Sequence, residues 1–249
     1  MTAGQRADLA LVARGLAPSR ARAQAMIAAG KVLAAGQPVT RAAQTVGDGD
    51  SLTLAEPDHP YVSRGALKLA AALPAFGIDP SGLDCLDIGA STGGFTDVLL
   101  RAGAKRVVAV DVGHDQMHDT LRADPRVMVR EGLNARDLSA GDLPDGFDGA
   151  DLIVCDASFI SLRLVLPPAM VLARPAARLV ALVKPQFEAG RQRLGKGGVV
   201  RDTAVRAAVL QETVDWFGEQ AGWRVTGTME SPVPGPKGNI EYLMAGVRT

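Results

Sequence analysis

A lysine closes a run of five apolar residues. The sequence LVALV at residues 179–183 precedes Lys184, and Pro185 follows it. The run predicts a buried strand, and the proline ends it because proline has no backbone N–H to donate to a sheet. An ammonium group at the end of a buried strand is costly unless a partner compensates its charge. Lys184 is therefore a candidate functional residue.

Two carboxylates are expected beside Lys184. Asp156 follows the apolar run at residues 152–155, and Glu241 stands near the start of the last predicted strand. The carboxyl ends of parallel strands meet at one edge of a sheet, and a final reversed strand begins at that edge. This topology gathers one lysine and two carboxylates, which are groups that move protons and stabilise developing charge. A second lysine, Lys68, lies on a predicted helix just before the sheet.

Strands and helices alternate along the rest of the chain beyond residue 60. The alternation predicts an α/β fold in which helices cover both faces of a parallel, doubly wound sheet. The last two strands are joined by residues 231–239, SPVPGPKGN, which are too few and too proline-rich for a crossover helix, so that pair is antiparallel. One reversed strand at the end of a seven-stranded, Rossmann-like sheet is typical of the class I methyltransferase fold. The predicted strands span 83–88, 106–111, 126–130, 150–155, 178–184, 223–230 and 240–247, and the helices 64–76, 95–102, 115–122, 162–173 and 203–221.

A glycine-rich loop follows the first of these strands. Its sequence, LDIGASTGGF at residues 86–95, opens a helix, which is where such loops bind nucleotides or anions. A dinucleotide fingerprint requires glycine at position 91, where this chain has Ser91, so NAD is a poor fit. With polar residues after the first three strands, the loop favours a nucleoside cofactor such as S-adenosylmethionine, which carries no phosphate. The predicted cofactor-binding residues are Asp87, Gly89, Ala90, Ser91, Gly93, Gly94, Phe95, Asp111, Val112, Asn134 and Asp156.

The start of the chain reads as a separate basic module. Residues 1–41 hold six arginines and lysines against one acid, Asp8. The proline-bounded segment EPDHP at 56–60 marks the boundary, which predicts domains at residues 1–58 and 59–249. The module has two predicted helices, at 7–15 and 19–30, and short strands at 31–39 and 50–55; the second helix is expected to bury Ala21, Ala25, Ile27 and Ala28 and to turn Arg20, Arg22 and Gln24 to water.

Two resemblances follow from these motifs. Residues 5–55, with RADLALVARGLAPSRARAQAMIAAGKV, resemble the S4 RNA-binding domain, a small α+β unit. The motifs SRGALKL, DIGASTGGF, CDASFISL, VKPQFE and GNIEY together resemble the FtsJ-type RNA ribose methyltransferases. The S4-like module narrows this to the TlyA (haemolysin A-like) family of rRNA methyltransferases.

The resemblance implies roles for particular residues. Members of that family methylate a ribose 2′-hydroxyl of cytidine in ribosomal RNA, in the large subunit, the small subunit or both, with a Lys-Asp-Lys-Glu tetrad. Matched motif to motif, the tetrad here is Lys68, Asp156, Lys184 and Glu241. Two readings of Lys184 stay open: it takes the hydroxyl proton as a neutral base, or it remains charged and holds the developing oxyanion while water takes the proton. Thr92 stands where FtsJ-type loops commonly have proline, which is expected to alter the stiffness of the loop.

Basic segments indicate how RNA is held. The segment EAGRQRLGKGGVVRD at residues 188–202 is long for a strand–helix connection, and we expect it to close over the RNA backbone. Phe159 either stacks on the target base or, as the favoured reading, packs in the core against the adjoining helix. The predicted RNA-binding residues are Arg6, Arg14, Arg20, Arg22, Lys31, Arg64, Arg191, Arg193 and Lys196.

Composition narrows the class of protein. The formal net charge is zero, and the cysteines Cys85 and Cys155 lie in predicted strands, as is typical of reduced, structural thiols. No apolar run approaches the length of a membrane span and no signal peptide is recognisable, so we expect a cytoplasmic monomer that works on ribosomal subunits without a metal. The alternatives are a membrane-active haemolysin and an RNA-binding protein with an inactive methyltransferase fold.

Overall fold

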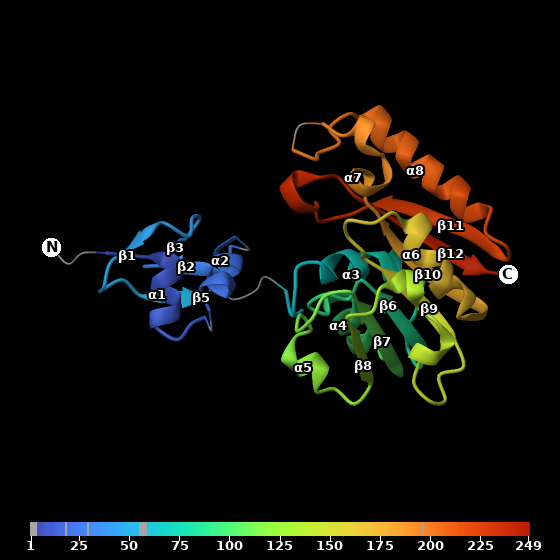
Figure 1. Ribbon diagram of the computed structural model, residues 1–249, viewed down its shortest axis with the longest axis horizontal. Helices are drawn as coiled ribbons and strands as arrows, with labels where there is room; N and C mark the ends of the chain where they lie inside the picture. Colours follow the sequence, from blue (N-terminus) through green and yellow to red (C-terminus); the bar gives the residue numbers. More distant parts are fainter. Residues whose placement is uncertain (1–3, 18, 29, 55–58, 196) are drawn as a thin grey trace. The chain divides into compact units, whose positions relative to one another are not determined.

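Contacts along the chain divide it at Pro60 and Tyr61. A computed structural model describes residues 4–17, 19–28, 30–54, 59–195 and 197–249 (Figure 1). The two units are Met1–Pro60 and Tyr61–Thr249. The sequence predicted the boundary two residues earlier.

The first unit is a small α+β fold. Helix α1 (Ala7–Ala13) packs on α2 (Arg20–Ala28), and β2 (Val32–Ala34) pairs antiparallel with both of its neighbours in a three-stranded sheet. Apolar residues of both helices and of the strands form a core of its own. The remaining strands are β1 (Gln5–Arg6), β3 (Gln37–Pro38), β4 (Thr45–Val46) and β5 (Leu52–Leu54).

The predicted buried stripe of α2 is right at Ile27 but wrong at its three alanines, and Arg20, Arg22 and Gln24 are exposed as predicted. The helix buries Ala23 and Ile27, whereas Ala21, Ala25 and Ala28 are exposed. The cause is Asp8, a buried carboxylate on α1 that accepts hydrogen bonds from Arg20 and Gln24. These two polar side chains draw one side of α2 toward α1, and the alanine-rich sequence provides little contrast between its faces.

The second unit is built on one sheet of seven strands in the order β11-β12-β10-β9-β6-β7-β8. β12 runs antiparallel to both of its neighbours, while the other pairs are parallel. This is the predicted sheet, with the last strand reversed. The strands are β6 (Asp84–Ile88), β7 (Arg106–Asp111), β8 (Val127–Glu131), β9 (Ala150–Cys155), β10 (Ala173–Val183), β11 (Trp223–Glu230) and β12 (Tyr242–Arg248).

Helices cover both faces of this sheet (Figure 1). Leucines and valines of α3, α4 and α5 pack in the core on one face, and those of α6 together with Phe217 of α8 pack in the core on the other. Cys85 and Cys155 are buried as free thiols in the strands between. The helices are α3 (Ala66–Ala75), α4 (Gly94–Arg101), α5 (Asp119–Arg122), α6 (Leu162–Val171), α7 (Pro185–Glu188) and α8 (Thr203–Gly218).

One helix is much shorter than the sequence predicts. The expected helix at 115–122 is reduced to α5, which begins at Asp119. The backbone N–H groups of Gln116 and Met117 donate to the Glu131 carboxylate, and Asp115 has a positive φ of 53°. These contacts hold the segment as a loop at the carboxyl edge of the sheet.

Candidate active site

Lys184 lies directly beside Asp156, as the topology predicts. Its Nζ is 2.7 Å from Asp156 Oδ1, an ion pair outside hydrogen-bonding angles. The ammonium donates hydrogen bonds to the Asp156 carbonyl oxygen at 3.0 Å and to Ser158 Oγ at 2.7 Å. The Lys184 side chain is buried, with 6% of its surface exposed. Three oxygens therefore surround the ammonium: two accept its hydrogen bonds, and the third compensates its charge.

The other two predicted tetrad members form a second buried pair. Lys68 Nζ on α3 donates to Glu241 Oε2 at 2.7 Å, and both side chains are buried. The second oxygen of Glu241 accepts from Gln186 Nε2 at 2.8 Å. Glu241 reaches Gln186 because β12 runs back along β10, where Tyr242 pairs with Val183. The reversed strand thus brings Glu241 to the end of β10.

A glycine at position 235 allows this packing, and the position of Gly65 shows where α3 begins. Gly235 lies against the Glu241 carboxylate so closely that a Cβ at this position would overlap its atoms. A Cβ on Gly65, just before α3, would lie 3.8 Å from Asp156 Oδ2. The start of α3 therefore lies next to Asp156, and the turn before β12 seals Glu241 from water.

The glycine-rich loop is held tightly against its neighbours. Gly89 has a φ of 78°, and a Cβ there would come within 2.8 Å of Ala157 Cα. The Asp111 carboxylate accepts hydrogen bonds from the backbone N–H groups of Ser91 at 2.8 Å and Gly113 at 2.7 Å. Asp111 therefore braces the loop from the end of β7, and its remaining lone pairs face the cavity that it lines.

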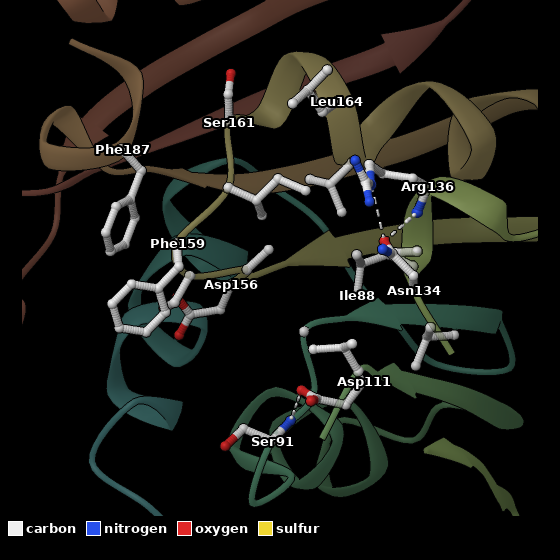
Figure 2. Close-up of a pocket in the computed structure, with 18 of the residues that line it drawn as sticks. Ile88, Ser91, Asp111, Asn134, Arg136, Asp156, Phe159, Ser161, Leu164 and Phe187 are labelled. Carbon is white, nitrogen blue, oxygen red and sulfur yellow. Dashed lines mark hydrogen bonds between the residues drawn. The ribbon is translucent and has the colours of Figure 1, made fainter. Parts of the chain in front are cut away.

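Two adjoining cavities open at this edge. One of about 1010 Å³ runs from the glycine-rich loop past Asp156 to Phe187, and one of about 220 Å³ lies between the loop and the residues before α3. Both are lined by Gly89, Ser91, Asp156 and Ser158. Figure 2 shows Asp111 and Ser91 on one side of the larger cavity and the two phenylalanines, Phe159 and Phe187, on the other.

Most predicted cofactor residues line these cavities. The larger is lined by Gly89, Ser91, Asp111, Val112, Asn134 and Asp156, and the smaller also by Ala90, Gly94 and Phe95. Asn134 follows β8 and accepts hydrogen bonds from the backbone and side chain of Arg136. Sequence reasoning missed Ser158, Gln186 and Phe187, which line the larger cavity and belong to the quoted motifs CDASFISL and VKPQFE; it also missed Leu133 and Arg136, which belong to none of the quoted motifs.

Asp87 and Gly93 line neither cavity. Asp87 lies within β6, not at its end, and its side chain is fully buried, where Thr96 Oγ1 on α4 donates to it at 2.6 Å. Gly93 packs against Met117 and Leu121. It is the N-cap of α4 and has a φ of 90°. Asp87 Oδ1 has no hydrogen-bond donor among the described residues. Burial, with a smaller contribution from the charge of Asp156, raises the pKa of Asp87 to about 7.

The favoured core position of Phe159 is wrong. The side chain is 90% exposed, and the residue has a positive φ of 65°. That backbone conformation turns the ring out of the sheet and toward Phe187, with ring centroids 5.1 Å apart and planes tilted by 46°. Phe159 thus forms an exposed aromatic wall of the larger cavity (Figure 2).

The predicted RNA-binding residues divide into paired and unpaired groups. Arg6 and Arg20 share the Asp8 carboxylate, and Arg14 donates to backbone carbonyls of residues 47–50. Arg193 pairs with Glu212 at 2.8 Å. Among the described residues, Arg22, Lys31 and the exposed Arg64 have no side-chain hydrogen bond or ion pair; the Arg191 side chain and Lys196 lie outside what the structure describes.

Comparison with known proteins places the chain. The model of the FtsJ-like methyltransferase family matches residues 61–248, and that of the S4 domain matches residues 5–52. The chain belongs to the TlyA branch of the FtsJ-like methyltransferase family. It is 48% identical to the 16S/23S rRNA (cytidine-2′-O)-methyltransferase TlyA of Mycobacterium tuberculosis strain H37Rv, over 96% of this chain and 88% of the relative.

Relatives of this family also carry haemolysin names. The chain is 41% identical to Hemolysin A of Brachyspira hyodysenteriae, over 96% of this chain and 98% of the relative. A solved structure of a hemolysin-like protein from Streptococcus thermophilus is 40% identical, with a TM-score of 0.77. The match covers 100% of this chain and 90% of the chain in that structure. The family, the S4 domain and the class I methyltransferase fold predicted from the sequence are confirmed. In the parts of the chain that the structure describes, no helix has the length and apolar character to cross a membrane.

The raised pKa of Asp87 predicts a pH-dependent stability. A carboxyl whose folded pKa is near 7, against an ordinary 3.8, costs the fold free energy once it ionises, so stability falls as pH rises from about 4 to above 7. Asp87→Asn removes this loss, which is at most roughly 4 kcal/mol. Urea unfolding at pH 5 and pH 8 measures the change in the free energy of unfolding, with Asp137→Asn, at an exposed position, as control. Equal pH dependence in Asp87→Asn and the unmodified protein would contradict the assignment.

Proposed function

We propose that this protein transfers the methyl group of S-adenosylmethionine to the ribose 2′-hydroxyl of a cytidine in ribosomal RNA. The observation that carries the proposal is the ion pair of the buried Lys184 with Asp156, which lines a cavity bounded by the glycine-rich loop. The name of the M. tuberculosis relative supports the reaction and the substrate. The S4 domain supports an RNA substrate.

The residues at the glycine-rich loop suit S-adenosylmethionine. Asp111 offers carboxylate lone pairs to ribose hydroxyls, and Val112 and Leu133 offer apolar surface to an adenine ring. Asp156, which lines both cavities, lies on the side that would receive a cation. When bound, S-adenosylmethionine supplies an electrophilic methyl group. Acidic residues around the site match its positive charge.

The contacts of Lys184 favour the second of the two readings of its role. Asp156 Oδ1, the Asp156 carbonyl oxygen and Ser158 Oγ are all acceptors, and they suit an ammonium ion with three N–H groups. We infer that Lys184 remains charged and stabilises the negative charge that develops on the 2′-oxygen, while the hydroxyl proton passes to water. Asp156, which lines both cavities, holds the ammonium and orients the hydroxyl.

Phe159 provides a surface for the target base. Its ring is exposed at the cavity wall next to Phe187, and Lys184 Nζ lies 5.9 Å from the centroid of the Phe187 ring. Aromatic rings beside a ribose-modifying site suit an unstacked base, because single-stranded bases stack on aromatic side chains. We therefore assign Phe159 to base stacking.

Lys184→Met tests the catalytic assignment. Methionine keeps the length of the side chain but removes the charge, so kcat should fall by at least about 100-fold while affinity for S-adenosylmethionine stays nearly unchanged. Transfer of radiolabelled methyl groups to ribosomal subunits measures kcat, and calorimetry measures cofactor affinity. Lys105→Met, at a 60% exposed lysine, is the control. Substantial turnover by Lys184→Met would refute the role.

Phe159→Ala tests the stacking assignment. Loss of one base–aromatic contact should lower kcat/KM for RNA by about tenfold or more, and Phe159→Trp should retain most activity. Val171→Ala, which trims an exposed apolar residue on α6, is the matched control. If Phe159→Ala methylates subunits as efficiently as the control, Phe159 does not hold the base.

Arg22 and Lys31 test the role of the first unit. Both side chains lack partners among the described residues, so they are available to phosphates. The double variant Arg22→Ala, Lys31→Ala should bind ribosomal subunits more weakly, and its log Kd should depend on log salt with a slope smaller by roughly one to two. The exposed Arg224→Ala is the control. An unchanged slope would show that Arg22 and Lys31 do not contact the RNA.

A further inference from the structure

Gln186 belongs to the motif VKPQFE but not to the tetrad, so the resemblance gives it no role. It lies on α7, two residues after Lys184, and its side chain is buried at the wall of the larger cavity. Its Nε2 donates to Glu241 Oε1 at 2.8 Å, and the other oxygen of Glu241 accepts from Lys68. Gln186, Glu241 and Lys68 therefore form one hydrogen-bonded chain.

Chemistry fixes the orientation of the Gln186 amide. An ionised carboxylate only accepts hydrogen bonds, so the nitrogen of the amide must face Glu241. The carbonyl oxygen then lies at the other end of the group, where Oε1 is buried and has no donor among the described residues. An unsatisfied buried acceptor costs about 1–3 kcal/mol, and the cost is removed when a donor arrives.

We propose that Gln186 is a positioning residue of the methyl-transfer site. Its amide nitrogen fixes the Glu241 carboxylate and, through it, the Lys68 ammonium, and its carbonyl oxygen accepts a hydrogen bond from an O–H or N–H of the nucleotide that enters the cavity. The inference rests on the proposed function, because the nucleotide is the methyl acceptor. Lys68 needs such an anchor, since Glu241 is its one acceptor among the described residues.

The neighbours of Gln186 point to a role at the substrate. Lys184 precedes it by two residues and contacts Asp156, and Phe187 follows it and contacts Phe159. Next in the chain, Glu188 accepts hydrogen bonds from Ser161 and from the backbone of Leu162. The single turn of α7 thus connects both ion pairs with the segment that carries Phe159 and Ser161. Within α7, Gln186 is the residue that contacts Glu241.

Gln186→Met removes both polar atoms of the side-chain amide, while the volume of the side chain stays nearly constant. We expect kcat for methylation of ribosomal subunits to fall by about tenfold to 100-fold, with the affinity for S-adenosylmethionine unchanged. Affinity for subunits in the presence of S-adenosylhomocysteine should fall by about three- to tenfold, because one acceptor for the nucleotide is lost. Gln211→Met, at an exposed glutamine of α8, is the matched control.

Gln186→Glu separates positioning from packing. The variant keeps an acceptor but places a second carboxylate against Glu241, so one proton must be shared between them. At low pH the shared proton restores the hydrogen bond between residue 186 and Glu241. When the proton is lost, the two carboxylates repel each other. Methylation by the variant should therefore fall as pH rises, over a range in which methylation by the unmodified protein does not fall. The other charged groups at this position, Lys68 and the Lys184–Asp156 pair, are common to both proteins.

The outcomes are distinguishable. If Gln186→Met keeps the kcat and the subunit affinity of the control, or if Gln186→Glu shows no additional pH dependence, the proposal is overturned. If the unmodified protein transfers no methyl group, the proposed function fails, and the affinities measured with S-adenosylhomocysteine still decide whether Gln186 contacts RNA.

Discussion

Two lysines are buried at one edge of a sheet, and their charges must be neutralised there. Moving an ammonium ion out of water costs several kcal/mol, which only close anions and hydrogen-bond acceptors offset. Lys184 has Asp156 and Lys68 has Glu241, so the four groups are neutral together. Glu241 has a further partner in Gln186, which keeps the second pair in fixed geometry.

The reversed strand β12 makes the pairing of Lys68 with Glu241 possible. If β12 ran parallel to β10, its first residue would lie at the opposite edge of the sheet. Antiparallel pairing of Tyr242 with Val183 instead places Glu241 beside the end of β10. Gly235 then lets the preceding turn close over the carboxylate. The topology of the sheet therefore determines where the charged groups of the site lie.

The sequence predicted the fold well because the periodicity of apolar residues and the short turn before β12 determine the order and direction of strands. Because strand ends converge, it also predicted that Lys184, Asp156 and Glu241 lie at one edge of the sheet, and the family resemblance added Lys68, which pairs with Glu241. It did not predict which way individual side chains point. Asp87 lies one residue before the end of β6, and the alternation of side chains along a strand turns it into the core beneath α4. The buried face of α2 depended on Asp8, whose partners are distant in sequence.

Backbone strain marks the two walls of the larger cavity. Ser91 and Phe159 are non-glycine residues with positive φ, at 47° and 65°, and both line it (Figure 2). Such conformations cost on the order of 1–3 kcal/mol each, and a phenylalanine exposed to water adds a further loss of hydrophobic burial. Neither cost improves packing. One strained residue begins the loop that is braced by Asp111, and the other turns an aromatic ring toward Phe187 beside Asp156. Two lining residues held in unfavourable conformations indicate that the cavity is shaped for what it binds.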